Sequence, residues 1–201
     1  MKLYHHYSLY GFSNVYLLGN DATKEALVVD PAEMNATLLG YIERNGYGLK
    51  GVLVTHNHTH HVRGLKTLLK IYDPLIYAAN ALVLGFPSRP VRDGEPFSCC
   101  GFEVLPHFLP GHSPDSVAYR VGHLVFTGDA LHAGILGKTL STHNAATLKR
   151  RLDERVFSLP DECVLLPGHG PPSTVGTERR FNVGLEPGYA ERVSDRYDFF
   201  V

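Results

Sequence analysis

Hydrophobic runs separated by turn-forming residues predict alternating strands and helices along the first part of the chain. Residues 4–29 carry β-branched and aromatic residues between turn formers, which predicts three short strands, and the Asp-Pro pair at 30–31 would end the third. Hydrophobic residues at helical spacing in 38–42 predict a helix that ends at the Asn-Gly pair at 45–46. The apolar run 51–54 then predicts a buried strand.

The rest of the chain shows the same alternation. Helical spacing resumes over 62–72 and again over 144–157, where Asn144 is the predicted N-cap. Short runs of β-forming residues predict further strands at 75–78, about 103–109, 116–121, 124–127 and 164–166. This order predicts the α/β class, with two sheets covered by helices in one sandwich.

Length and composition favour a single domain that acts on a small molecule. The chain has 201 residues, of which 44% are hydrophobic, so it can bury one large core; we assign 1–183 to this domain and 184–201 to its C-terminal tail. Its 19 basic and 20 acidic residues give a net charge of -1, which disfavours nucleic-acid and anionic-membrane partners. Because the chain shows no apolar run of the signal-peptide or membrane-spanning type, we expect a cytoplasmic protein, either monomeric or homodimeric.

Histidine is the residue type that points to chemistry. Six of the 12 histidines lie in short motifs, and four of these follow the strand predicted at 51–54, in a strand-to-helix loop. In an extended segment, side chains two apart point the same way, so His56, His58 and His60 should converge, while His61 reaches a neighbouring position. Such imidazoles suit zinc, iron, nickel or copper. The alternative is a solvated histidine-rich loop or a metal-storage tract.

Three further motifs each place one potential metal ligand in a tight loop after a predicted strand. They are Pro110-Gly111-His112-Ser113, Thr127-Gly128-Asp129 and Pro167-Gly168-His169-Gly170. Taken singly, each would more often be a hydrogen-bonded loop histidine or a turn aspartate. Together with the four-histidine cluster they indicate one metal centre, because a preorganised site needs ligands held at the ends of strands in a rigid sheet.

These four motifs, in this order and at these intervals, resemble the metallo-β-lactamase superfamily, and within it the glyoxalase II-like hydrolases, as a short single-domain member. The likeness rests on residues 55–64, 110–116, 126–129 and 167–171, and it continues into 175–182. The resemblance implies an αββα sandwich, in which two mixed sheets are flanked by helices. It also implies two transition-metal ions, zinc or iron, at one edge of the sandwich.

The resemblance assigns a role to each ligand. The residues implied for the first ion are His56, His58 and His112, and those implied for the second are His61 and His169. Asp129 would bridge the two ions and would orient or deprotonate the metal-bound water. One position departs from the pattern, because the family has an aspartate where this chain has His60. Either His60 ligates the second ion, or it swings out and leaves that site weak, or the centre works with one metal.

The resemblance further implies hydrolysis of an acyl bond by a metal-bound hydroxide, most directly of a thioester of the hydroxyacylglutathione type. Lys138 matches the lysine with which the family contacts glutathione, whereas Leu140 stands where an aromatic residue is usual. His132 and His143 flank the predicted mouth of the site, and we treat them as candidate substrate-binding residues. From the length of 201 residues we expect no helical C-terminal domain of the kind through which two-domain members bind the thiol carrier.

Three other functions remain open at this point. A mononuclear iron persulfide dioxygenase would use His56, His112 and Asp129 as a triad of two histidines and one carboxylate. A lactonase or β-lactamase would direct the same hydroxide at another activated acyl group. A metal-binding or sensing module would retain the ion, while His60 would have abolished catalysis.

Overall fold

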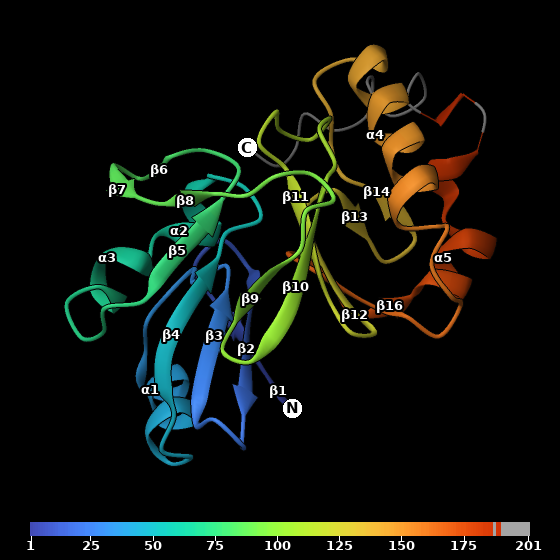
Figure 1. Ribbon diagram of the computed structural model, residues 1–201. Coiled ribbons are helices and arrows are strands. Elements are labelled where there is room, and N and C mark those ends of the chain that lie inside the picture. Colours follow the sequence, from blue (N-terminus) through green and yellow to red (C-terminus); the bar gives the residue numbers. More distant parts are fainter. Residues whose placement is uncertain (187, 190–201) are drawn as a thin grey trace.

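The protein, here as a computed structural model, is described over residues 1–186, 188 and 189. Two six-stranded mixed sheets pack face to face, with helices on their outer faces (Figure 1). The predicted αββα sandwich is therefore confirmed. None of the helices in the described part of the chain could span a bilayer.

The first sheet is built mainly from the N-terminal half of the chain. Its strands, in spatial order, are β1 (Lys2–Ser8), β2 (Ser13–Asn20), β3 (Glu25–Val29), β4 (Gly48–Leu53), β5 (Leu75–Ala78) and β8 (Arg89–Pro90). The first three strands pair antiparallel, and β4, β5 and β8 add to them in parallel. The connections carry α1 (Ala36–Glu43), α2 (Thr59–Val62), α3 (Leu65–Leu68) and a small hairpin of β6 (Leu82–Val83) and β7 (Phe86–Pro87).

The second sheet is built from the C-terminal half. Its strands, in spatial order, are β16 (Ser173–Thr174), β15 (Val164–Pro167), β12 (Leu124–Gly128), β11 (Val117–Val121), β10 (Phe102–Phe108) and β9 (Phe97–Cys99). Only the β12–β15 pair is parallel. The remaining elements are the hairpin of β13 (Leu131–His132) and β14 (Ile135–Leu136), α4 (Thr142–Arg155), α5 (Val175–Phe181) and the 3-10 helix η1 (Val183–Leu185).

Helix α4 covers the outer face of the second sheet. Leu148 and Leu152, one helical turn apart, are fully buried against that sheet. The helix begins earlier than predicted: its N-cap is Ser141, whose Oγ accepts a hydrogen bond from the backbone N–H of Asn144 at 3.1 Å. The prediction of Asn144 as the N-cap was therefore wrong, because the serine three residues upstream accepts a free N–H of the first turn, that of Asn144 itself.

The layer between the sheets holds the largest buried side chains. Tyr119 and Phe126 are fully buried there, and the rings of Tyr16 and Phe126 lie 5.4 Å apart. The hydroxyl of Tyr119 donates to the carbonyl oxygens of Val54 at 3.1 Å and Tyr77 at 3.2 Å. Since Tyr119 belongs to the second sheet while Val54 and Tyr77 belong to the first sheet or its exit loop, these bonds fix the two sheets against each other beside the ends of β4 and β5.

Two local predictions need correction or fall outside the described residues. The single helix predicted over 62–72 is replaced by two short helices, α2 and α3, which the Arg63-Gly64 pair separates. Gly64 packs against the backbone of Glu33 and Pro31, and a Cβ atom at position 64 would come within 2.5 Å of it, so no larger residue fits there. Of the tail predicted at 184–201, residues 187 and 190–201 lie outside the described part of the chain.

Candidate metal centre

All seven predicted ligands meet at the carboxyl ends of strands from both sheets. Two follow β4, two lie on α2, and the others follow β10, β12 and β15 in turn. Five imidazoles place a ring nitrogen within 3.8 Å of the single atom Oδ2 of Asp129; they belong to His56, His60, His61, His112 and His169. Segments more than 100 residues apart in the chain thus form one cluster around one carboxylate.

The path of the chain through this cluster differs from the predicted one. His58 is the N-cap of α2, and His60 and His61 lie within its single turn, so the cluster is not one extended segment. The prediction that His56, His58 and His60 converge because they alternate along an extended strand was therefore wrong, since His60 lies on a helix. His60 instead groups with His56, His61 and Asp129, whereas His58 groups with His56, His112 and Asp129.

The first group has the geometry of a three-imidazole site. Nε2 of His56 lies 3.0 Å from Nδ1 of His58, which in turn lies 3.1 Å from Nε2 of His112. Oδ2 of Asp129 lies 3.8 Å from Nε2 of His56 and 3.7 Å from that of His112. Ligand atoms of one tetrahedral zinc ion are about 3.4 Å apart, since each lies about 2.1 Å from the ion. These separations therefore suit donors that share one ion.

Hydrogen bonds on the far side of each ring set which nitrogen carries the proton. Nδ1 of His112 donates to the carbonyl oxygen of Lys138 at 2.8 Å, which leaves its Nε2 as a lone-pair donor. Nδ1 of His56 lies 3.0 Å from Oγ1 of Thr55, whose own proton goes to Asp30 at 2.6 Å, so this Nδ1 also donates. Two unprotonated nitrogens thus face the same point, an arrangement that a cation stabilises.

The second group is built around the same oxygen of Asp129. Oδ2 of Asp129 lies 3.2 Å from Nε2 of His61, 3.4 Å from that of His169 and 3.8 Å from that of His60. Nδ1 of His169 donates to the carbonyl oxygen of Phe12 at 2.9 Å, which again leaves Nε2 free to bind a cation. His60, in the position where the related family has aspartate, therefore offers an imidazole toward the same carboxylate.

The buried histidines differ in ionisation around the carboxylate of Asp129: His56 favours the neutral form, whereas His61 favours the charged form. Burial, together with the neighbouring His61, lowers the pKa of His56 to about 2. Burial would raise the pKa of Asp129, but contacts with His132 and His169 hold that pKa well below its ordinary value of 3.8. For His61 burial acts against the charged form, yet Asp129 and Asp30 outweigh it and raise the pKa to about 10. A metal ion that binds His61 would have to displace its proton.

Unpaired polar atoms at the centre provide an independent test of whether a metal ion fits. Among the described residues, Oδ1 of Asp129 and Nε2 of His132 are buried and have no hydrogen-bond partner. Buried polar atoms without a partner are uncommon in folded proteins, and an ion is one of the groups that accounts for them. Together with the lone-pair nitrogens of the first group, these atoms show that the donor set fits a transition-metal centre.

Asp30 supports this centre, although the sequence pattern marks it only as the end of a strand. Its Oδ1 accepts the backbone N–H of Thr55 at 2.8 Å, and its Oδ2 lies 3.2 Å from Nδ1 of His61. The backbone of Asp30 adopts a φ of 49°, in the left-handed region that non-glycine residues rarely occupy. A carboxylate behind a metal-binding histidine orients the ring and strengthens its donor nitrogen.

The substitution Asp30→Asn should weaken the second metal position. We expect the affinity of the second ion to fall by about 10- to 100-fold, because the carboxylate behind His61 is lost, while the first ion is retained. Zinc titration of the metal-free protein against a chromophoric chelator measures both steps. Asp153→Ala, an exposed aspartate on α4, is the control and should leave both affinities unchanged. Equal second-ion affinities in Asp30→Asn and the unsubstituted protein would show that Asp30 does not act on the centre.

The three candidate substrate residues lie in different surroundings. His132 belongs to the centre itself, with Nε2 at 3.6 Å from Oδ1 of Asp129. Lys138 contacts the site through its carbonyl oxygen, which holds His112, and its side chain is exposed. His143 is exposed in the first turn of α4. Contact of any of the three with substrate stays a prediction.

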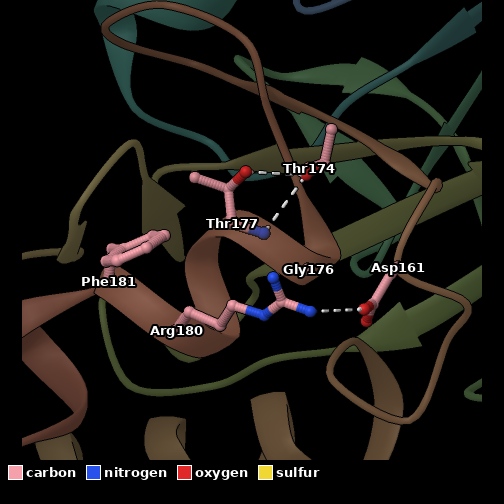
Figure 2. Close-up of a pocket in the computed structure, with 6 residues that line it drawn as sticks. All are labelled: Asp161, Thr174, Gly176, Thr177, Arg180 and Phe181. Atoms are coloured by element: carbon pink, nitrogen blue, oxygen red, sulfur yellow. Dashed lines mark hydrogen bonds and ion pairs between the residues drawn. The ribbon is translucent and has the colours of Figure 1, made fainter.

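A separate pocket of about 220 Å³ lies beside α5 and contains none of the candidate ligands (Figure 2). It is lined by Asp161, Thr174, Gly176, Thr177, Arg180 and Phe181. An ion pair of 3.6 Å between Arg180 and Asp161 crosses it, and Oγ1 of Thr174 accepts the backbone N–H of Thr177 at 3.2 Å as the cap of α5. The polar side chains of this pocket therefore already bond to one another. The metal centre, where buried polar atoms lack a partner, is the candidate functional site.

Two mixed sheets between helices, with a histidine-aspartate centre at the strand ends, define a metallohydrolase-type domain. A family model described as the metallo-beta-lactamase superfamily matches residues 10–87 and 84–169. The chain therefore belongs to the metallo-β-lactamase superfamily.

Individual relatives agree with this assignment. A probable metallo-hydrolase, YqgX of Bacillus subtilis, is 31% identical over 194 residues, which cover 85% of this chain and 90% of the relative. A hydroxyacylglutathione hydrolase of Chromohalobacter salexigens is 33% identical over 160 residues, which cover 77% of this chain but only 61% of that enzyme. The crystal structure of ETHE1 from Myxococcus xanthus superposes with a TM-score of 0.88 at 25% identity, covering 100% of this chain and 92% of that one.

A further solved structure bears on the metal. TTHA1623, described in a di-iron-bound form, superposes with a TM-score of 0.73 at 29% identity and covers 90% of this chain and 98% of that one. The superfamily assignment and the histidine-aspartate cluster together make this chain a candidate to bind zinc or iron.

Proposed function

We propose that the protein hydrolyses an acyl bond, and that its substrate is a thioester of the hydroxyacylglutathione type. The observation that carries the proposal is the meeting of three imidazole nitrogens, at 3.0 and 3.1 Å from one another, beside the ionised carboxylate of Asp129. The relative named hydroxyacylglutathione hydrolase supports the choice of substrate. That enzyme is longer than the matched region, so its substrate is a proposal for this chain.

The bound metal would lower the pKa of water and polarise the acyl oxygen. His56, His58 and His112 would hold the first ion, and His60, His61 and His169 the second, with Asp129 between them. The low pKa of Asp129 makes it a weak base, so it would orient the attacking water by accepting its hydrogen bond rather than by removing the proton outright. Lys138 accepts the hydrogen bond of His112 through its carbonyl oxygen, and its exposed side chain would bind a carboxylate of the thiol carrier.

We propose zinc as the native metal, with iron as the alternative. Seven of the eight donor side chains at the centre, counting His132, are imidazoles, and only Asp129 is a carboxylate. Imidazole serves both zinc and iron well, while a second carboxylate, which would favour harder ions such as manganese, is replaced here by His60. The di-iron relative supports iron as the alternative.

A mononuclear iron persulfide dioxygenase is the second candidate function. It is favoured by the replacement of the usual aspartate with His60, whose ring is 38% exposed and lies 3.8 Å from Oδ2 of Asp129, farther than the rings of His61 and His169. If this weakens the second ion, one iron would remain on His56, His112 and Asp129.

Two assays on the same metal-loaded preparation separate the candidates. Thiol release from lactoylglutathione measures thioester hydrolysis, and oxygen consumption with glutathione persulfide measures the dioxygenase reaction. We expect saturable thiol release without oxygen consumption. Oxygen consumption without thiol release would overturn the hydrolase proposal in favour of the dioxygenase.

A wider substrate panel tests the remaining alternatives. Activity confined to lactones or β-lactams would keep the hydrolytic chemistry but change the substrate. Metal retention with no turnover of thioesters, esters, lactones or phosphodiesters would indicate a metal-binding module. The predicted result is thioester turnover at least about tenfold faster than that of any other class, because the proposed site would contact the thiol carrier as well as the acyl group.

A further inference from the structure

We infer that His132 is a ligand of the second metal ion and that it compensates for the missing aspartate at position 60. The set of metal ligands implied by the superfamily resemblance does not include His132. Its Nε2 lies 3.6 Å from Oδ1 of Asp129, and both atoms are buried without a hydrogen-bond partner in the described part of the chain. The inference concerns metal binding alone and does not depend on which reaction the centre performs.

The separation of the two unpaired atoms suits a shared ion. At 3.6 Å they are too far apart for a normal hydrogen bond. Donors on one tetrahedral ion lie about 3.4 Å apart, as the metal-ligand distances require. Each ring nitrogen of the second group shows a similar separation from the other oxygen of Asp129, between 3.2 and 3.8 Å. The distance from His132 to Oδ1 therefore falls in the same range as the distances from the other ligands of this group to Oδ2.

The ring of His132 lies in contact with a ring of the second group. Its centroid lies 5.9 Å from that of His169, which itself lies 5.0 Å from His61 and 5.3 Å from His60. Four imidazoles thus contact Asp129, three of them at Oδ2 and His132 at Oδ1. An aspartate at position 60 would have supplied a compact anionic donor, and the longer, partly exposed ring of His60 leaves this site in need of another.

The backbone that carries His132 is fixed independently of any ion. The hairpin of β13 and β14 follows Asp129 directly, and Oγ1 of Thr127 donates to the carbonyl oxygen of Leu131 at 2.9 Å. At the far end of the hairpin, the N–H of Gly134 donates to the buried carboxylate of Glu178 at 2.9 Å. A donor held in place before the ion arrives loses little conformational entropy on binding, as a preorganised ligand should.

Zinc titration of metal-free protein tests the inference. In His132→Ala we expect the affinity of the second zinc ion to fall at least about tenfold and the first to be unchanged, because one direct donor is lost. His123→Ala, an exposed histidine of the β11–β12 turn, is the matched control and should bind both ions as the unsubstituted protein does. Two zinc ions bound with unchanged affinities in His132→Ala would overturn the inference.

A second measurement does not depend on the fold of a variant. In a crystal structure of the unsubstituted protein grown with zinc, Nε2 of His132 should lie about 2.1 Å from the second ion. A second ion coordinated without His132, or the absence of a second ion at saturating zinc, would also overturn the inference. Since neither experiment follows turnover, a protein that binds zinc through His132 but cleaves no thioester would contradict only the proposed function.

Discussion

Asp129→Ala should lose both the bound metal and the hydrolytic activity. We expect turnover of lactoylglutathione to fall by about 1,000-fold or more, at the upper end of the loss seen when a catalytic electrostatic group is removed. Asp129 is the carboxylate that both groups of ligands share, so its removal leaves no anion between the two groups of imidazoles. Metal content by elemental analysis and thiol release at saturating substrate measure the two effects together.

The control for this variant is an aspartate outside the centre. Asp153→Ala, on the exposed face of α4, should keep the metal content and turnover of the unsubstituted protein. Asp129→Asn keeps the size of the side chain but not its charge, and it should retain less than half of the metal because an amide is a poor ligand for zinc. If Asp129→Ala kept the metal content and turnover of the unsubstituted protein, the proposed metal centre would be contradicted.

Phe126→Ala should cause the largest loss of stability. The side chain is fully buried between the sheets, and its ring lies 5.4 Å from that of Tyr16. We expect the free energy of unfolding to fall by about 3 to 5 kcal/mol, the usual effect of removing a buried phenylalanine ring and leaving a cavity. Urea unfolding followed by circular dichroism measures the change.

A second phenylalanine provides the comparison. Phe181 at the end of α5 is 71% exposed, so Phe181→Ala should change the free energy of unfolding by no more than about 0.5 kcal/mol. A loss below about 1 kcal/mol in Phe126→Ala would mean that the layer between the sheets contributes less to stability than its burial indicates.

The longer strands and helices could be predicted from the sequence because each carries a recognisable run of β-forming residues or apolar residues at helical spacing. The run 51–54 matches the end of β4, and 124–127 matches β12 almost residue for residue. Strands such as β6, β7 and β16 contain only two residues each, which is too short for any alternation to show. The break between α2 and α3 also has no periodic signal, since it results from the close packing of Gly64 against Pro31 and Glu33.

The candidate ligands could be predicted because each lies in a distinctive motif, and the structure brings all seven together. The supporting residues could not. Asp30 acts on His61, 31 positions later in the chain, through a contact that only the pairing of β3 with β4 creates. His132 was predicted only as a substrate-binding residue, because it carries no ligand motif and its approach to Asp129 depends on the hairpin that immediately follows. Such roles depend on tertiary geometry, which spacing along the chain does not encode.

An X-ray structure of the protein grown with zinc, with anomalous data collected at the zinc edge, would show whether the ligands enclose an ion. We expect an anomalous peak enclosed by His56, His58, His112 and Asp129. A structure in which these four side chains point apart with no ion between them, at saturating zinc, would contradict the metal centre and the function that depends on it.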